Sequence, residues 1–155
     1  MAEGRPKTLS VAATWEGGYR ARMDVRGHEL IADEPTSAGG EDTGPQPSEF
    51  LLASLASCFT LAIYHVAHKR DIELDSLSVT ATGTYEGPKF ARIVLEVSSS
   101  APRDVLDPLI ERAKAVCYVS NTFRAVSDIE VVIADGTGAG AQPTQPEPPE
   151  APLSI

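Results

Sequence analysis

Hydrophobic and polar residues alternate along the N-terminal part of the chain with the period of two that is typical of β-strands. Residues 8–15 and 19–25 alternate on either side of a Gly-Gly pair, which predicts a β-hairpin. Residues 28–33 (HELIAD) predict a third strand. The glycine- and proline-rich residues 35–46 then predict a loop, and its length in a small domain indicates that it is functional or mobile.

A helical pattern follows this loop. Pro47 suits the first position of a helix, and Glu49 lies in the first turn, where a negative charge complements the helix dipole. From there to about Lys69, apolar residues occupy nearly every face of the helix. The pattern therefore predicts a helix that is buried inside the protein and not laid on its surface.

The rest of the chain continues with strands and a helix. Residues 76–85 and 90–98 predict a second hairpin around a Gly-Pro turn, and residues 102–116 predict a second helix that stops before the polar residues 118–122. Residues 127–134 predict a last strand. Because the helices are inserted between hairpins, the order β-β-β-α-β-β-α-β predicts an α+β fold with antiparallel sheets and not a parallel nucleotide-binding fold.

The last residues of the chain, 136–155, differ in composition from the rest. They hold five of the 12 prolines, three of the 12 glycines and no aromatic residue. Such a segment cannot bury enough apolar surface to offset its chain entropy. We therefore expect one domain over residues 1–135 and a disordered proline- and glycine-rich tail over residues 136–155.

The chain is acidic. Its 13 basic and 22 acidic residues give a net charge of −9, which repels phosphate groups and argues against both nucleic acid and an anionic membrane surface as partners. No apolar run approaches the roughly 18 residues needed to cross a bilayer. Residues 1–7 lack the apolar core of a secretory signal. We therefore expect a cytoplasmic protein with no membrane partner.

The two cysteines are too few for a disulfide scaffold and suit redox or catalytic work in a cytosolic chain. Cys58 lies midway along the first predicted helix, and Cys117 lies at the end of the second. Free cysteine is often a small buried hydrophobe, and this structural interpretation stays open. Position argues against it, because hydroxyl residues surround Cys58 and a polar, turn-prone run follows Cys117.

A metal site is the first alternative for these residues. Cys58 and His65 are seven residues apart, about 10 Å along a helix axis, so they cannot bind one zinc ion together. His65 and His68 could meet on one helix face, but no third ligand is suggested nearby. We therefore expect neither a metal nor a cofactor.

Two motifs around the cysteines resemble the signature of a known family. Residues 33–58 include DEP, GGEDTGP and PSEFLLASLASC, and residues 117–122 read CYVSNT. These motifs are similar to those of the OsmC/Ohr (osmotically induced / organic hydroperoxide resistance) family, and the chain resembles its OsmC-like branch. Tyr118 stands where the family usually has proline. The resemblance implies an OsmC-like α+β fold, with antiparallel β-sheets packed around two main helices in an intertwined homodimer.

The resemblance also implies a mechanism. Cys58 matches the cysteine that attacks the peroxide and becomes a sulfenic acid, and Cys117 matches the cysteine that resolves it as a Cys58–Cys117 disulfide. An external dithiol, lipoyl-linked in this family, would then reduce the disulfide. The implied function is a thiol-dependent peroxidase that reduces organic hydroperoxides to alcohols.

Two charged residues of the family support the thiolate. Glu49 matches the glutamate at the start of the central helix, and the family's arginine follows a Gly-Gly pair. Arg20 stands one place late, and strand alternation puts Arg22 on the same face, so we take Arg20 as the catalytic arginine and keep Arg22 as the alternative. About 13 Å of helix axis and half a revolution separate Glu49 from Cys58. If Glu49 orients the arginine at Cys58, it comes from a partner chain, which predicts an obligate dimer.

An apolar wall around Cys58 would favour an organic hydroperoxide over the strongly hydrated hydrogen peroxide. An alternative function is an OsmC-like dimer that binds a small apolar or electrophilic ligand, or senses redox state, without significant peroxidase turnover. Tyr118 and the displaced arginine favour this alternative. The expected wall consists of Phe50, Leu55, Phe59, Val119 and Phe123.

Overall fold

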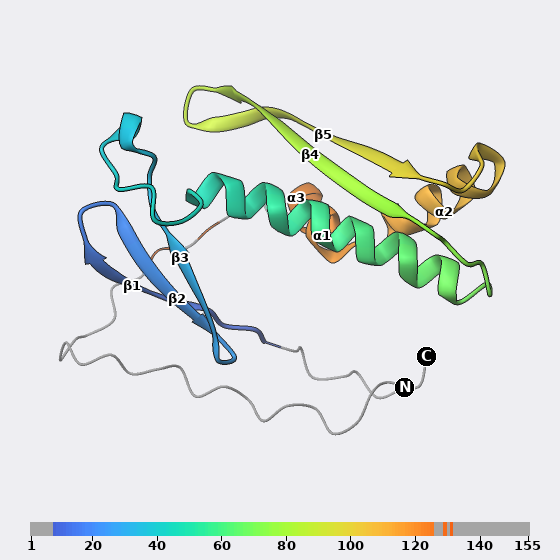
Figure 1. The fold of residues 1–155 in the computed structure, drawn as a ribbon, viewed down its shortest axis with the longest axis horizontal. Coiled ribbons are helices and arrows are strands. Elements are labelled where there is room, and N and C mark those ends of the chain that lie inside the picture. The colour runs from blue at the N-terminus through green and yellow to red at the C-terminus, as the bar shows by residue number, and fades with distance from the viewer. Residues whose placement is uncertain (1–7, 126–128, 130, 132–155) are drawn as a thin grey trace. The chain divides into compact units, whose positions relative to one another are not determined.

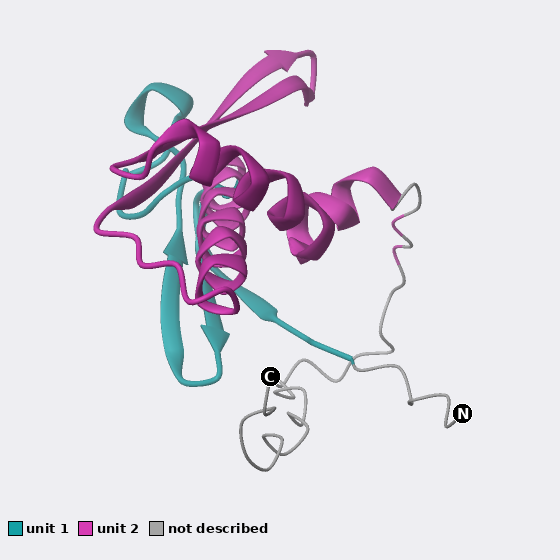
Figure 2. Ribbon diagram, turned by 90° about the vertical axis from the view of Figure 1, so that its right-hand side faces the viewer, with its two compact units in different colours: residues 1–47, 133–155 teal, residues 48–132 magenta. Residues whose placement is uncertain are grey.

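A computed structural model of the chain describes residues 8–125, 129 and 131 (Figure 1). These residues fall into two compact units, of which one ends at Pro47 and the other begins at Ser48 (Figure 2). Each unit has a sheet of its own, and every strand pair in the described residues is antiparallel. The predicted antiparallel α+β architecture is therefore confirmed.

The N-terminal unit is a three-stranded sheet. In spatial order its strands are β1 (Ala12–Gly17), β2 (Arg20–Val25) and β3 (His28–Ala32). Gly17 and Gly18 have positive φ angles of 113° and 52°, which residues with a side chain rarely adopt, and so this pair can form the turn between β1 and β2. The predicted hairpin and third strand are confirmed, although β1 begins at residue 12 instead of residue 8.

The predicted loop after β3 is closely packed. It contains a short 3₁₀ helix, η1 (Thr36–Ala38), and its backbone returns to the end of β3, where the amide of Asp33 donates to the carbonyl of Pro45 over 3.2 Å. A Cβ atom on Gly40 or Gly44 would overlap backbone carbonyl groups that belong to β3 or the residues just after it. Small residues are therefore needed here because the loop folds back onto its own start.

The second unit holds the two predicted helices and the second predicted hairpin. The two strands pair along their whole length, from Leu77 opposite Ser99 to Glu86 opposite Lys89. The sequence predicts the boundaries of the two helices and the two strands of the hairpin correctly to within one or two residues. The elements of the unit are α1 (Pro47–His68), β4 (Leu77–Glu86), β5 (Lys89–Ser99), α2 (Arg103–Val116) and α3 (Tyr118–Ala125).

One face of α1 forms the core of this unit. It lies along the β4–β5 hairpin (Figure 1), from which Val79, Leu95 and Val97 pack against the buried cluster. Helix α2 covers the same cluster with side chains that repeat every three or four residues, as expected for an amphipathic helix. The buried cluster consists of Phe59, Ala62, Ile63, Val66, Ala67, Leu109, Ala113 and Cys117.

The other face of α1 is exposed, so the prediction that this helix is buried on nearly every side is wrong for the single chain. Leu61 is 65% exposed and Tyr64 is 56% exposed. The physical reason is that the β4–β5 hairpin and α2 cover one side of the helix only. The apolar composition of α1 therefore exceeds what its own unit buries.

Helix α1 also corrects a prediction about membranes. The helix has 22 residues, and an 18-residue window within it has a mean hydropathy of 1.8, so it is long and apolar enough to cross a bilayer by length and composition alone. The scattered hydroxyl residues interrupt the apolar run without lowering this average much. Ser54 and Thr60, for example, donate their hydroxyl protons to the carbonyl groups of Leu51 and Ala56 within the helix.

Helix α3 was not expected, because the polar residues 118–122 suggested that the chain leaves helical structure. The helix path breaks only at Cys117, whose φ of −75° and ψ of 105° are extended, and then resumes. The hydroxyl groups of Ser120 and Thr122 donate to the carbonyls of Cys117 and Tyr118. Polar side chains thus form hydrogen bonds with the helix backbone here.

Three predictions for the C-terminal part of the chain lie outside the described residues. They are the last strand, apart from Ile129 and Val131, the end of the domain at residue 135 and the tail.

Candidate active site

The two cysteines meet, although 59 residues separate them in the chain. Cys58 lies midway along α1, and Cys117 lies at the break between α2 and α3. Their Sγ atoms are 3.4 Å apart, and both residues are free thiols. A disulfide bond is about 2.05 Å long, so the two sulfurs must approach by only about 1.4 Å to form one. The pair predicted from the sequence is therefore brought together.

The two sulfurs differ in their exposure. Cys117 is fully buried in the core of its unit, whereas Cys58 is partly exposed. A reactant from solution can reach the partly exposed cysteine directly. The buried cysteine can react only with a group inside the protein, such as the neighbouring cysteine. The geometry thus distinguishes an outer cysteine, Cys58, from an inner cysteine, Cys117.

The N-terminus of α3 supplies the polar groups around this pair. Burial raises the pKa of Cys58, and the amides of Val119 and Tyr118 oppose the increase only in part. Burial would also raise the pKa of Cys117, but the hydroxyl and amide of Ser120, with the Cys58 thiol and the amide of Val119, lower that pKa below its usual value. The first turn of α3 therefore stabilises a thiolate on Cys117, and Cys58 needs a further positive charge to ionise readily.

Glu49 stays apart from the cysteine pair along α1. It lies in the first turn of the helix and is exposed. Because α1 is continuous, about 13 Å of helix axis separates the Cα positions of Glu49 and Cys58. The separation of Glu49 and Cys58 along the helix is thus the one predicted from the sequence.

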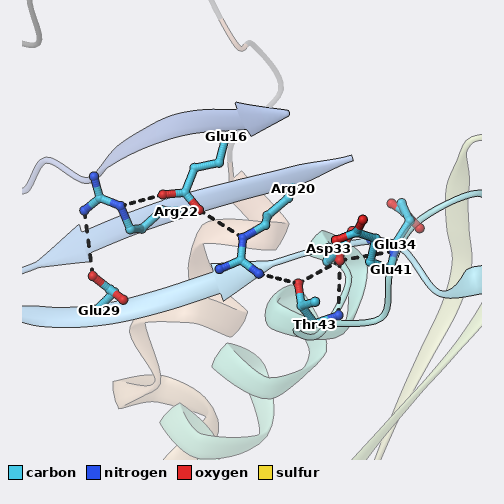
Figure 3. Close-up of polar contacts among 8 residues, drawn as sticks. All are labelled: Glu16, Arg20, Arg22, Glu29, Asp33, Glu34, Glu41 and Thr43. Carbon is cyan, nitrogen blue, oxygen red and sulfur yellow. Dashed lines mark hydrogen bonds and ion pairs between the residues drawn. The ribbon is translucent and has the colours of Figure 1, made fainter. Parts of the chain in front are cut away.

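The two candidate arginines lie together on the N-terminal sheet (Figure 3). The Nε atoms of Arg20 and Arg22 each lie 2.9 Å from a different carboxylate oxygen of Glu16. Both side chains therefore share one face of β2, as strand alternation predicts. Arg22 also pairs with Glu29 over 3.8 Å, whereas Arg20 donates from Nη1 to the hydroxyl oxygen of Thr43 over 2.8 Å.

Thr43 connects Arg20 to a buried carboxylate. Asp33, 1% exposed, accepts four hydrogen bonds: from the Thr43 hydroxyl over 2.8 Å and from the amides of Thr43, Glu34 and Glu41. These bonds, of which the one from the Thr43 hydroxyl is the strongest influence, hold the pKa of Asp33 below its usual value despite burial. Asp33 is thus an ionised residue around which the loop folds.

A cavity of about 420 Å³ lies in the second unit, and neither cysteine lines it. Phe59, which follows Cys58, and Ser120, which donates to the Cys117 carbonyl, both line it. Phe59 belongs to the expected apolar wall, whereas Phe123 of that wall is 49% exposed. The cavity also has more charge than the sequence suggested. The remaining lining residues are Leu95, Val97, Arg103, Asp107, Ile110, Lys114 and Arg124.

Side chains that bind metal ions do not gather in the described residues. In the part of the chain that the structure describes, no group of three or more histidine, cysteine or acidic side chains could hold a metal ion. The cysteine pair itself offers the chemistry of two neighbouring thiols.

Comparison with known proteins identifies the family. Residues 39–132 match the model of the OsmC-like protein family. The chain belongs to this family. The match spans the β4–β5 hairpin and both cysteines, so the resemblance first seen in the two motifs is confirmed. No curated protein is significantly similar to the chain in sequence.

Solved structures share the OsmC-like fold. An OsmC-like protein from Mycoplasma pneumoniae has a TM-score of 0.66 at 19% identity, covering 79% of this chain and 92% of its own. An organic hydroperoxide resistance protein, OsmC, from Legionella pneumophila has a TM-score of 0.58 at 24% identity, covering 77% and 93%. A third, from Elizabethkingia anophelis with thiocyanate bound, is called an organic hydroperoxide resistance protein and has a TM-score of 0.59 at 25% identity, covering 79% and 91%.

The family assignment also bears on α1. OsmC-like proteins are soluble α+β proteins. In this chain α1 has the buried face of a core helix, formed by residues such as Phe59 and Ile63. The apolarity of α1 is therefore explained in part by the face that packs in the core of its own unit.

Sequence reasoning missed several residues that support the site. Glu16, Thr43 and Asp33 were not assigned a role, although the last two lie inside the family motif. The spacing of Glu16 and Arg20, four residues apart across a tight turn, is a signal that could have found the first. Ser120 lies inside CYVSNT, and its place in the first turn of α3 could be recognised only once α3 was known.

Proposed function

We propose that this OsmC-like protein is a thiol-dependent peroxidase that reduces organic hydroperoxides to alcohols. The observation that carries the proposal is the 3.4 Å separation of two free cysteine sulfurs at the two positions of the family motifs. Two structural neighbours named organic hydroperoxide resistance proteins support the choice of substrate class.

The proposed reaction has two chemical steps on the protein. The Cys58 thiolate attacks the terminal oxygen of the hydroperoxide, the O–O bond breaks, and the leaving alkoxide takes a proton to become the alcohol. Cys58 is then a sulfenic acid. The Cys117 thiolate attacks its sulfur, hydroxide leaves, and a Cys58–Cys117 disulfide forms. An external dithiol reduces this disulfide through two exchange steps, and a lipoyl-linked dithiol is the reductant that the family resemblance suggests.

The environment of each sulfur supports this assignment of roles. Cys58 is the partly exposed sulfur, so it suits the residue that meets the hydroperoxide. Cys117 is buried and has a lowered pKa, so it suits the residue that attacks from inside once the sulfenic acid has formed. The reverse order would require the hydroperoxide to reach a fully buried thiol.

Arg20 and Glu49 complete the proposed catalytic group. The raised pKa of Cys58 requires a full positive charge, which we assign to the guanidinium of Arg20. Glu49 would orient that guanidinium from a second copy of the chain in a homodimer. The exposed apolar face of α1, with Leu61 and Tyr64, supports such a dimer because it offers a surface for a second α1 helix. We expect this dimer to act in the cytoplasm.

One observation favours a second candidate function, the binding of a small ligand without peroxidase turnover. The 420 Å³ cavity of the second unit combines four apolar residues and Asp107 with the cations Arg103, Lys114 and Arg124. A cavity of this size is within the range of small-molecule sites. Tyr118, in place of the usual proline, is exposed at the start of α3 and favours the same alternative.

The proposed function is tested by dithiol-dependent consumption of cumene hydroperoxide by the wild type and by the Cys58→Ser and Cys117→Ser variants. We expect no activity above background for Cys58→Ser and one turnover without recycling for Cys117→Ser. Hydrogen peroxide serves as the comparison substrate and should be consumed more slowly by the wild type. Equal slow consumption by all three proteins would reject the enzyme and leave the ligand-binding alternative.

A further inference from the structure

We propose that Asp33 and Thr43 are positioning residues that hold the guanidinium of Arg20 without neutralising its charge. The inference rests on the proposed function in one respect, namely that Arg20 serves the Cys58 thiolate. The three residues form a chain of hydrogen bonds within the N-terminal unit, which Figure 3 shows.

The direction of each hydrogen bond in this chain is fixed by chemistry. A guanidinium only donates, so the Thr43 hydroxyl oxygen accepts from Nη1 of Arg20, at 2.8 Å. The single hydroxyl proton of Thr43 then points to Oδ2 of Asp33, also at 2.8 Å. An ionised carboxylate only accepts, so the hydroxyl proton of Thr43 is directed to Asp33. A lone pair of the same oxygen is then left to accept from Arg20.

The anchor of this chain is rigid. Asp33 is buried and ionised, and three backbone amides hold its carboxylate in addition to Thr43. The loop that carries Thr43 is closely packed, since Gly40 and Gly44 have no room for a Cβ atom. Thr43 therefore presents its oxygen to Arg20 from a fixed position. This hydrogen bond restricts the position of the flexible Arg20 side chain, and a cation that acts in catalysis must be held in a defined position.

The contrast with Arg22 shows why a hydroxyl matters. Arg22 pairs with two carboxylates, Glu16 and the 65% exposed Glu29, and these compensate its charge. Arg20 shares Glu16 with Arg22 and also donates to the neutral hydroxyl of Thr43. The negative charge of Asp33 lies one hydrogen bond further away. Within its own chain, Arg20 thus donates to one carboxylate and one neutral hydroxyl, whereas Arg22 pairs with two carboxylates, which favours Arg20 for the thiolate-stabilising role.

A purely structural role for the chain is the competing explanation, because the same bonds also close the loop. The two roles differ in their dependence on Arg20. If Thr43 acts through Arg20, its loss has no effect on Cys58 in a protein that already lacks the guanidinium. If Thr43 merely stabilises the loop, its loss adds to the loss of Arg20.

The test compares Thr43→Val, Thr43→Ser, Arg20→Met and the double variant Thr43→Val/Arg20→Met. The first readout is the pH dependence of Cys58 alkylation by iodoacetamide, with Cys117→Ser in every protein so that one thiol reacts. We expect Thr43→Val to raise the apparent pKa of Cys58 by about one pH unit and Thr43→Ser to leave it unchanged. The double variant should match Arg20→Met alone.

The second readout is the rate of hydroperoxide consumption by the same substitutions in the chain with both cysteines. We expect Thr43→Val to slow it about tenfold at neutral pH, and Thr80→Val, an exposed threonine on β4, to have no effect. Thermal unfolding of each variant verifies that the protein is folded. Asp33→Asn, in which the hydroxyl loses its charged acceptor, should repeat the effect of Thr43→Val.

Three results would overturn the proposal: a wild-type alkylation profile for folded Thr43→Val, an additive effect in the double variant, or no effect of Arg20→Met on Cys58. Failure of the proposed function would look different. Wild-type protein would then show no Cys58-dependent peroxide consumption, while the alkylation profiles would still report whether Thr43 acts on Cys58 through Arg20.

Discussion

The Sγ atoms of Cys58 and Cys117 lie 3.4 Å apart in the reduced protein, and they belong to the same packed unit. Cys58 itself packs against the core that contains Cys117, and the α1 residues Phe59, Ala62 and Ile63 that follow it are members of the same core. The separation is therefore set by core packing and not by a flexible loop. The reduced state is thus already close to the geometry of the disulfide.

From this relationship we predict that one equivalent of hydroperoxide oxidises the chain to an intramolecular Cys58–Cys117 disulfide without a change of fold. Intact mass should fall by about 2 Da, both thiols should become resistant to alkylation, and the far-ultraviolet circular dichroism spectrum should stay the same. Cys117→Ser should instead form a sulfenic acid that dimedone traps. Disulfide-linked chains as the main product would contradict the proposed pairing.

The Ser120 hydroxyl should control the second chemical step. In the structure this hydroxyl lies within reach of the Cys117 carbonyl, and its proton must turn to the sulfur to stabilise a thiolate. It is the largest influence that lowers the pKa of Cys117, so we expect Ser120→Ala to raise that pKa and to slow disulfide formation about three- to tenfold at neutral pH. The first step, attack by Cys58, should change less. Rapid mixing with dimedone competition separates the two steps, because slower resolution increases the trapped sulfenic acid.

Thr122→Ala is the matched control for this prediction. Thr122 lies in the same helix, and its hydroxyl donates to the carbonyl of Tyr118 over 2.8 Å, away from the sulfur atoms. We expect this variant to resolve at the wild-type rate. An equal loss in both variants would mean that the hydroxyl groups act by stabilising α3 and not through Cys117.

Local patterns in the sequence predict most of the fold. Both hairpins follow from alternation around glycine-containing turns, and α1 follows from Pro47 and the high apolar content of the 22 residues that form the helix. These signals depend on neighbours in the chain, so periodicity captures them. The break at Cys117 depends on one backbone conformation, ψ of 105°, and the polar residues after it could equally form a turn, which is why α3 was missed.

The site is less accessible to such reasoning. No periodicity relates Cys58 to Cys117, and only the motif resemblance predicted that they act together. The bonds from Thr43 to Arg20 and Asp33 depend on how the loop closes, which its glycine-rich composition leaves open. The apolar composition of α1 does not tell whether its own chain or a second copy covers each face. These features depend on contacts between distant residues.

Asp33 should make the stability of the protein depend on acidic pH. Its pKa is lowered in the folded protein, so its contribution to the free energy of unfolding is present above the ordinary pKa of an aspartate, about 3.9. This contribution is lost as the pH falls through the lower pKa of the folded state. We therefore expect the thermal midpoint of the wild type to decrease between about pH 4 and pH 2, and Asp33→Asn to show a smaller decrease because it has no carboxyl group at this position. Parallel pH curves for the two proteins would contradict the prediction.

The exposed face of α1 should form the dimer interface. A charge introduced at Leu61, which is 65% exposed, costs little in the single chain but would be buried without a partner against a second helix. We therefore expect Leu61→Glu to shift the protein from dimer to monomer in sedimentation equilibrium and to abolish hydroperoxide consumption, because Glu49 of the second copy would be lost from the site. Thr80→Glu, on the exposed side of β4, is the control and should remain an active dimer. A wild-type protein that is a stable, active monomer would refute both the interface and the proposed role of Glu49.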